Sequence, residues 1–294
     1  MNGLFLIDKP TDMTSFGVVA RIRRLTGEKC GHSGTLDPFA TGLLPVMVGK
    51  ATKLCDLLTK GDKEYVGTLR FGAATDTGDL TGTVIATCEK KVTARELEEL
   101  FPQFIGKITQ RPPAYSAIKV NGVPLYRLAR KGQEVEVPER QVTVYEMELL
   151  SFDQEAGEAV IRVACSKGTY IRSLFSDLAV AAGTVGTTVA LRRTRVGALS
   201  LADAVPLEEL MNKLEENPCP PEFMPVEAAL QELPRYEPVD FFAGLLQNGC
   251  AVDIRKLKNL PEGLCTVYRG ETLLGLGDQV IKDGETCFKV VIHL

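Results

Sequence analysis

The sequence contains no tryptophan, only two histidines and no cysteine pair with C-x-x-C spacing. Zinc sites need closely spaced Cys or His ligands, and neither His32 nor His293 lies near such a group, so we expect no metal site. The eight cysteines are scattered, and the N-terminal stretch MNGLFLIDKP lacks the basic start and long apolar run of a secretory signal. We therefore expect reduced thiols and a cytoplasmic location.

Long hydrophobic runs are absent as well. Lys, Arg, Asp or Gly interrupts every apolar stretch before the roughly 18 residues that a membrane span requires, so we expect no membrane association. The composition, with 45% hydrophobic and 24% charged residues, is typical of globular proteins. A chain of 294 residues is long enough for one large domain or two domains of ordinary size.

The sequence has no overall excess of positive charge, because its formal net charge is −4. This average does not exclude RNA as a partner, since the acidic side chains are concentrated in residues 203–240. That segment has ten Asp and Glu residues against only Lys213 and Arg235, which leaves the chain before it basic on balance. For contacts with nucleic acid, the distribution of charge matters more than its sum.

Hydrophobic patterning predicts an α+β fold with two domains. The proline-rich stretch 216–225 is interpreted as a linker, and the glycine turns that follow predict a small β-rich domain. We expect a large domain at residues 1–232, built around a mixed, mostly antiparallel sheet, and a small β-rich domain at 233–294. The expected strands are residues 4–8, 63–72, 142–152 and 158–166, and the expected helices are residues 15–26 and a segment capped by Thr169 and closed by Gly183.

The stretch HSGTLDPFATGLL, residues 32–44, contains the first candidate for chemistry. Asp is a favoured helix N-cap and Pro a favoured first helical residue, so Asp37 followed by Pro38 indicates the start of a helix. The alternative is a reacting carboxylate in a segment rich in glycine. The local sequence favours the helix cap and leaves the alternative open.

Three further side chains have both an ordinary and a functional interpretation. Tyr65 lies in a predicted strand, where packing alone accounts for an aromatic residue. His32 is suited to a loop or capping role. Arg172 falls in the first turn of its predicted helix, where the helix dipole disfavours a cation, so a nearby buried carboxylate would explain its presence. None of the three determines a function by itself.

Residues 111–140, RPPAYSAIKVNGVPLYRLARKGQEVEVPER, form an unusually long segment with four prolines. It also has a basic cluster at Arg127, Arg130 and Lys131. A compact domain seldom keeps such an excursion without a function. The cluster is suited to an arm that closes on RNA through shape and backbone contacts, and the alternative is a plain surface loop.

Six segments together resemble the TruB-type tRNA pseudouridine synthases, and they follow one another in order along the chain. The most specific of them contains GTLDPFATGLL, and the C-terminal part resembles the PUA domain of that family more weakly, through LLGLGD. The six are LIDKPTDMTS (residues 6–15), GHSGTLDPFATGLLPVMVGKATKL (31–54), KEYVGTLRFGAATDTGD (63–79), RPPAYSAIKVNGVPLYRLARKG (111–132), CSKGTYIRSL (165–174) and ALRRTRVG (190–197).

The resemblance implies an isomerase that converts uridine 55, in the T-loop of tRNA, to pseudouridine by base flipping and without a cofactor. It implies that Asp37 is the essential aspartate and that Arg172 is its basic partner. It also implies that Tyr65 stacks on the target base and is placed to move a proton, and that His32 holds the RNA loop or the flipped base. The other implied contacts are Leu191, which lines the pocket, and the basic residues Lys9 and Lys53 near it.

An ionised carboxylate in a dry pocket needs an opposing charge, because burial raises its pKa and an adjacent guanidinium lowers it. We therefore hypothesise a buried ion pair between Asp37 and Arg172, although the two are far apart in sequence.

The expected partner is the T-arm of tRNA, bound by a monomer without an obligate protein partner. Two other interpretations are a non-catalytic RNA-binding or RNA-folding helper and the catalytic subunit of a guide-RNA particle. The combination of Asp37, Tyr65 and Arg172 favours the enzyme, because a pure binder does not require a carboxylate beside anionic RNA. The expected arm and the absence of basic tails favour a protein that acts alone.

Overall fold

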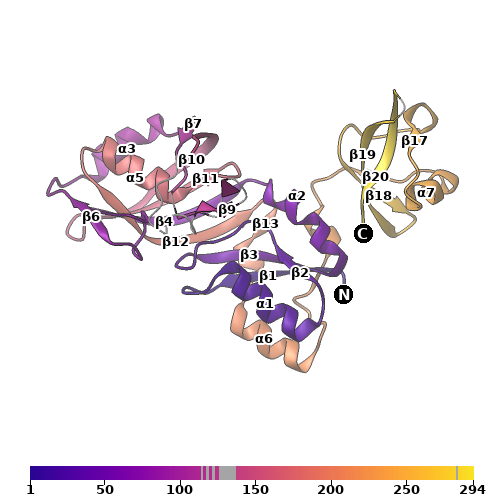
Figure 1. Ribbon diagram of the computed structural model, residues 1–294, viewed down its shortest axis with the longest axis horizontal. Helices are drawn as coiled ribbons and strands as arrows, with labels where there is room; N and C mark the ends of the chain where they lie inside the picture. The colour runs from indigo at the N-terminus through magenta and orange to yellow at the C-terminus, as the bar shows by residue number, and fades with distance from the viewer. Residues whose placement is uncertain (114, 117–118, 121–122, 126–136, 283) are drawn as a thin grey trace.

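The computed structural model describes residues 1–294 apart from 114, 117–118, 121–122, 126–136 and 283. The molecule is elongated and has two parts: a larger body that contains one long sheet, and a smaller β-rich part formed by the C-terminal residues (Figure 1). The basic cluster of the expected arm, Arg127, Arg130 and Lys131, lies outside the described residues.

The body is built on an eleven-stranded mixed sheet. Its strands are β1 (Gly3–Lys9), β2 (Cys30–His32), β3 (Thr41–Val48), β4 (Lys63–Phe71), β7 (Gly106–Gln110), β10 (Arg140–Asp153), β11 (Glu158–Cys165), β12 (Gly186–Val196), β13 (Leu199–Ser200), β14 (Val205–Pro206) and β15 (Met224–Pro225). The central path runs β14, β1, β3, β12, β4, β11, β10, β7. Among the described strands of this sheet, neighbours are antiparallel except in two pairs, β1 with β14 and β3 with β12. The expected mostly antiparallel sheet is confirmed.

Helices cover different regions of this sheet (Figure 1). They are α1 (Ser15–Thr26), α2 (Cys55–Thr59), α3 (Ala94–Leu100), α5 (Ile171–Ala181) and α6 (Leu207–Glu216). The first and last of these lie side by side next to β1, whereas α5 packs on β12 and β4. The predicted start of α1 is confirmed: the Thr14 hydroxyl accepts a hydrogen bond from the Gly17 N–H, and Val18 and Ile22 are buried.

Shorter elements complete the body. They are the 3₁₀ turns η1 (Gly49–Leu54), η2 (Phe101–Gln103), η3 (Leu201–Asp203) and η4 (Val226–Ala229), and the strand pairs β5 (Ala73–Thr75) with β6 (Val84–Thr87) and β8 (Lys119–Val120) with β9 (Val123–Pro124). Within the described residues, no helix combines the length and the apolarity needed to cross a membrane.

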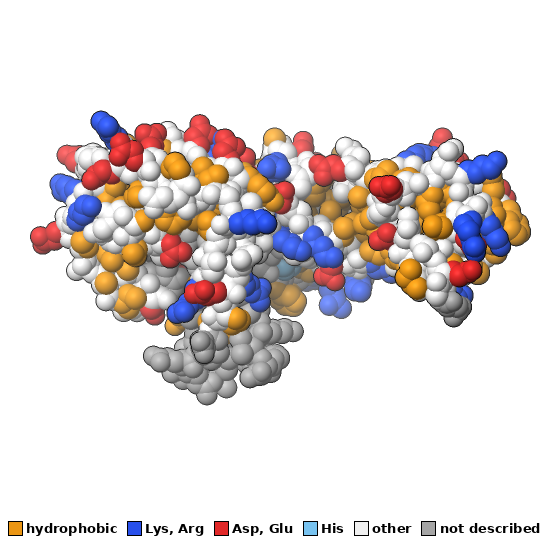
Figure 2. Space-filling model, turned by 90° about the horizontal axis from the view of Figure 1, so that it is seen from above, with side chains coloured by type: hydrophobic (Ala, Val, Ile, Leu, Met, Phe, Trp, Pro, Cys, Tyr) orange, Lys and Arg blue, Asp and Glu red, His pale blue; other side chains and the backbone are white. Residues whose placement is uncertain are grey.

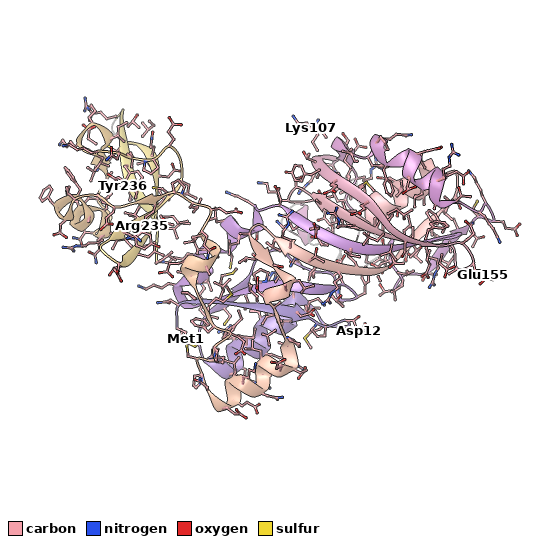
Figure 3. The ribbon with its side chains drawn as sticks, turned by 180° about the vertical axis from the view of Figure 1, so that it is seen from behind. Met1, Asp12, Lys107, Glu155, Arg235 and Tyr236 are labelled. Carbon is pink, nitrogen blue, oxygen red and sulfur yellow. The ribbon has the colours of Figure 1, made fainter. Side chains whose placement is uncertain are left out.

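The smaller part is a five-stranded sheet in the order β16, β18, β19, β20, β17. Its elements are β16 (Arg235–Tyr236), α7 (Asp240–Gln247), β17 (Val252–Asp253), η5 (Ile254–Lys256), β18 (Cys265–Arg269), β19 (Thr272–Lys282) and β20 (Glu285–His293). Figure 3 shows Arg235 and Tyr236 in this part, far from Lys107 and Glu155 in the body. Leu276 and Ile292 belong to an apolar cluster that also includes Leu4 and Leu54 of the body, so apolar packing joins the two parts.

The prediction that a helix starts at Asp37 is wrong. The chain that follows, TGLLPVMV, forms β3, which lies between β1 and β12 and is buried on both faces. A continuous apolar run is typical of a strand buried on both faces, and Pro45 in its middle would break a helix. Asp37 lies in the loop between β2 and β3, where its carbonyl accepts a hydrogen bond from the Ala40 N–H.

The predicted cap of α5 is wrong as well. The residue before the helix is Tyr170, and it makes no capping hydrogen bond through its side chain. The Thr169 hydroxyl donates to the Ser166 carbonyl instead, at 2.9 Å. Both threonine and tyrosine are thereby kept in the loop that precedes Arg172, and this loop forms part of the pocket described next.

Candidate active site

A pocket of about 530 Å³ opens on the body, formed where β4, β12 and three loops meet. Its volume lies within the roughly 300–1,000 Å³ that is usual for small-molecule sites. Four of the predicted site residues line it: Asp37, Tyr65, Arg172 and Leu191. The other lining residues are Gly34, Thr35, Leu36, Thr59, Lys63, Ser116, Arg140, Gln141, Val142, Ser166, Lys167, Gly168, Thr169, Tyr170, Ile171 and Arg193.

The loop that carries Asp37 is held on both sides of the aspartate. The Ser15 hydroxyl donates to the Leu36 carbonyl at 3.1 Å and accepts from the Leu36 N–H at 2.9 Å. On the other side, the Lys9 ammonium donates to the Pro38 carbonyl at 3.1 Å. These contacts, from the end of β1 and the start of α1, fix the backbone from which the carboxylate projects.

Arg172 binds Asp37 through two of its nitrogens. Its Nε lies 2.9 Å from Oδ2 and its Nη2 lies 3.2 Å from Oδ1 of the aspartate. The arginine is 3% exposed and the aspartate side chain 34%, so the carboxylate reaches the pocket while the guanidinium lies behind it. The hypothesised ion pair is present, and its two-point geometry is the strong form of an arginine–carboxylate contact.

The guanidinium has a second carboxylate partner that the sequence did not identify. Its Nη1 lies 3.1 Å from Oδ2 of Asp79, whose side chain is 5% exposed. The other oxygen of Asp79 accepts hydrogen bonds from Thr77 Oγ1 at 2.9 Å and from the Thr81 N–H at 2.9 Å. Asp79 stands in the stretch ATDTGDLTG, residues 74–82, where the threonines around it are the one local signal of a held carboxylate.

Opposing effects act on the ionisation of Asp37. Burial raises the pKa of its carboxyl above the ordinary value of 3.8, and the adjacent Arg172 guanidinium opposes that shift. The charge of Asp79 raises the pKa further, and the Lys9 ammonium lowers it. The outcome is a raised pKa, which makes the carboxylate more basic than an exposed aspartate.

Tyr65 and Leu191 form part of the floor of the pocket. Leu191 on β12 is paired with Gly67 on β4, and Tyr65 is two residues away on the same face of β4. A Cβ at Gly67 would lie 2.7 Å from the Phe175 ring and 3.3 Å from Leu191, so the glycine makes room for both side chains. Burial raises the pKa of the Tyr65 hydroxyl, and the Arg193 guanidinium opposes the shift.

Three predicted contact residues lie outside the pocket lining. Lys9 is buried, and its ammonium also donates to the Pro10 and Met13 carbonyls. His32 lies in β2, its Nδ1 has no hydrogen-bond partner within the described residues, and burial together with the Arg193 charge lowers its pKa. Lys53 in η1 donates to the carbonyl of His293 in the smaller part, at 2.7 Å.

The geometry provides a carboxylate, held by an arginine, above a floor with one aromatic and one aliphatic side chain. Such an arrangement suits a flat ring that stacks on the floor while its substituent faces Asp37. Within the described parts of the chain, no group of three His, Cys, Asp or Glu side chains is placed to hold a metal ion.

Comparison with known proteins gives consistent matches. Residues 23–171 match the family described as TruB family pseudouridylate synthase, N-terminal domain. The tRNA pseudouridine synthase B of Geobacillus thermodenitrificans is 44% identical over 256 residues, which cover 85% of each chain. The protein of the same name from Caulobacter vibrioides is 40% identical over 285 residues, which cover 94% of this chain and 92% of that one.

Solved structures show the same fold. A chain in a crystal structure of a Cbf5–Nop10–Gar1 complex has a TM-score of 0.76 at 26% identity, and the match covers 99% of this chain and 84% of that chain. A chain in an H/ACA RNP bound to a substrate RNA containing 2′-deoxyuridine has a TM-score of 0.73 at 25% identity, with 99% and 84% covered.

Proposed function

Because this chain belongs to the TruB family of pseudouridylate synthases and isomerises uridine to pseudouridine in tRNA, we propose that Asp37 is its catalytic carboxylate. The proposed substrate is uridine 55 in the T-loop. The observation that carries the assignment is the two-point contact of Asp37 with the buried Arg172 at the edge of a pocket sized for a nucleoside.

The target uridine must leave its stack to enter this pocket. Flipping a base out of a folded RNA costs a few kcal/mol. Stacking on Tyr65 offsets part of that cost, because a base on an aromatic side chain gains roughly 1–3 kcal/mol. We propose that Leu191 contacts the base beside Tyr65, and that His32 holds the RNA loop from β2.

In the reaction, the C1′–N1 bond of the flipped uridine breaks, the base turns and C5 bonds to C1′. The proton on C5 is lost, and N1 gains one. Asp37 acts beside the bond that breaks, as a nucleophile, as a base or by stabilising positive charge on the sugar. Arg172 acts as a positioning residue, since it holds the Asp37 carboxylate and balances its charge. Asp79 acts through Arg172, because it holds the guanidinium from the other side.

We propose that the rest of the tRNA binds along the body and the smaller part. Figure 2 shows Lys and Arg side chains on the surface between these two parts. The proposed contacts include Lys9 and Lys53, the arm residues Arg127, Arg130 and Lys131, and a PUA-like domain at residues 233–294 that follows a catalytic domain at 1–232. We infer that the protein works in the cytoplasm as a monomer, without a cofactor or an obligate protein partner.

Tritium release from unmodified tRNA labelled at C5 of uridine tests the proposal. Wild-type protein should release tritium as C5 loses its proton, and Asp37→Asn should release none above background. The affinity of the variant for tRNA should stay within about tenfold of wild type, because phosphate contacts dominate RNA binding.

The matched control is Asp177→Asn, which changes an exposed aspartate on the same helix as Arg172. It should release tritium at the wild-type rate. Release by Asp37→Asn at the wild-type rate would contradict the role of this carboxylate. Binding of tRNA without release by the wild-type protein would favour an RNA-folding helper over the enzyme.

A further inference from the structure

The floor of the pocket has an apolar end and a cationic end. On β4, Lys63, Tyr65 and Gly67 are alternate residues and therefore share one face of the sheet. On β12, Arg193 is paired with Tyr65, and Leu191 is paired with Gly67. Arg193 thus lies directly across from Tyr65, with the apolar pair Gly67 and Leu191 on one side of these two residues and Lys63 on the other. Both cations line the pocket.

Arg193 is buried without a carboxylate. It is 1% exposed, and its Nε and Nη2 donate to the carbonyls of Leu43 and Gly34 at 2.8 and 3.0 Å. Its neighbour Arg192 is paired with Asp8, whereas no ion pair of Arg193 is found in the described part of the chain. Burying an unpaired charge is costly. Because the unpaired guanidinium of Arg193 lines the pocket, we infer that the bound ligand supplies the negative charge that pairs with it.

The remaining nitrogen of Arg193 is left uncovered by a glycine. A Cβ at Gly34 would lie only 3.2 Å from Nη1, so any other residue there would cover this atom. Gly34 also has a φ of +74°, which other residues adopt at a cost. Nη1 therefore faces Gly34 in the loop that leads to Asp37, and a hydrogen bond from Arg193 to the Tyr65 hydroxyl opposes the rise in the pKa of that hydroxyl, so a base stacked on Tyr65 lies next to this guanidinium.

Lys63 reinforces the same end of the floor. It is 5% exposed, and its ammonium donates to the carbonyls of Thr59 and Gly61, which leaves one N–H without an acceptor in the described residues. Burial lowers the pKa of Lys63 to about 8, and the Arg193 charge acts in the same direction. Negative charge placed between the two side chains would relieve this repulsion.

We propose that Arg193, supported by Lys63, is a catalytic residue that stabilises the negative charge of the uracil ring while the base is detached from the sugar. The inference rests on the proposed function. As the C1′–N1 bond breaks, its electron pair stays with the base and spreads over N1, O2 and O4. The electron-deficient C1′ faces Asp37. When C5 attacks C1′, the pair forms the new bond, the C5 proton leaves and N1 is protonated.

The geometry favours the ring over a phosphate as the partner of these cations. A phosphodiester is joined to RNA on both sides and stays near the mouth of the pocket, whereas Arg193 and Lys63 are almost fully buried. By contrast, the edge of a base that stacks on Tyr65 lies close to Arg193 and Lys63. Fixed charges in a site that excludes water act most strongly on charge that develops during the reaction.

Single-turnover loss of the starting nucleoside from tRNA with uridine or 5-fluorouridine at the target position tests the proposal, with the tRNA digested to nucleosides and separated. In 5-fluorouridine, C5 has no proton to lose after it bonds to C1′, so the fluorine stays on C5, water adds its hydroxyl group to C6 and N1 takes the proton. Fluorine withdraws electrons and makes the detached base anion more stable, so this base depends less on the cation. Arg193→Gln should slow the conversion of uridine by about 100-fold, the usual effect of removing one such group, and that of 5-fluorouridine by about tenfold or less. The affinity for tRNA should be unchanged.

Arg192→Gln is the matched control, because it removes a neighbouring arginine whose side chain is outside the pocket lining and 42% exposed. It should slow both substrates equally or neither.

Lys63→Gln, measured in parallel, should also slow the reaction of uridine more than that of 5-fluorouridine. This variant replaces Arg193→Gln in the test if Arg193→Gln does not fold. Equal slowing of the two substrates by both pocket variants would overturn the proposal, as would a loss of tRNA affinity with an unchanged rate at saturation. Failure of the wild-type protein to convert uridine would instead refute the proposed function.

Discussion

At the scale of single residues, Asp37 depends on the balance between burial and one neighbouring charge. Burial raises the pKa of its carboxyl, Asp79 adds to the rise, and Arg172 opposes it. The ionised form is present above the raised pKa and is lost as the pH falls through it. The rate at saturating tRNA should therefore decline on the acidic side with an inflection above the ordinary value of 3.8.

Arg172→Gln should move that inflection to higher pH. The substitution removes the largest effect that lowers the pKa of Asp37 and leaves burial and Asp79 in place. The carboxyl can be followed by carbon-detected NMR titration, which does not depend on activity, with Asp37→Asn used to assign the signal. An unchanged or lower pKa in Arg172→Gln would contradict the pairing as the cause.

Asp79 is a second test at this scale. Asp79→Asn keeps the shape of the side chain but removes the charge that faces Arg172 Nη1. We expect tritium release to fall by about 100-fold, the usual cost of a misplaced catalytic group, with little change in tRNA affinity. Asp76→Asn is the control, because Asp76 is exposed in the same loop and accepts a hydrogen bond from the Thr83 N–H. A full rate in Asp79→Asn would show that Asp37 alone orients the guanidinium.

At the scale of elements, the site depends on how closely β3 approaches β12. The two strands run parallel, with Gly42 paired with Arg193. A Cβ at Gly42 would lie 2.3 Å from the Arg193 carbonyl oxygen and 2.8 Å from its nitrogen, both of which are backbone atoms. Only a glycine allows this contact, which brings the Asp37 loop next to the floor formed by β4 and β12.

Gly42→Ala should therefore destabilise the protein by more than the cost of its backbone conformation alone, which is about 1–3 kcal/mol. Gly27→Ala is a matched control, because Gly27 also has a positive φ, +69°, but no atom lies within 4 Å of its Cβ position. Urea unfolding of the two variants gives the comparison. Equal losses in the free energy of unfolding would contradict the steric explanation.

At the scale of the whole molecule, an apolar cluster joins the smaller part to the body. Leu276 of β19 is fully buried in the same cluster as Leu4, Leu43 and Leu54. The Lys53 ammonium adds a hydrogen bond to the His293 carbonyl at the same junction. This packing fixes the orientation of the smaller part relative to the pocket.

Leu276→Ala should cost about 2–5 kcal/mol, the usual range for truncating a buried leucine. We expect calorimetry to show the smaller part unfolding before the body, because the cavity forms at their junction. Ile281→Ala, on the same strand but 73% exposed, should change stability by about 0.5 kcal/mol or less. A single unshifted transition in Leu276→Ala would contradict the role of this cluster.

Local sequence determined much of the protein by itself. The Thr14 cap and the apolar positions of α1, and the alternating residues of β4, follow from propensity and periodicity over a few neighbours. The resemblance to a family identified Asp37 and Arg172 as a pair. Only the tertiary structure decided that Asp37 stands before a strand and not a helix, since β3 becomes a strand through burial between β1 and β12.

The tertiary structure also decided which groups complete the site. The local sequence gives no signal for the role of Arg193 and, for Asp79, only the threonines around it, because an aspartate in a polar loop and an arginine in a strand are ordinary on the surface. Their roles follow from contacts with residues that are distant in sequence. Asp79 binds Arg172, which is more than ninety residues away, and Arg193 binds the Leu43 carbonyl, which is a hundred and fifty residues away. Periodicity reports on neighbours along the chain, whereas desolvation and ion pairing depend on neighbours in space.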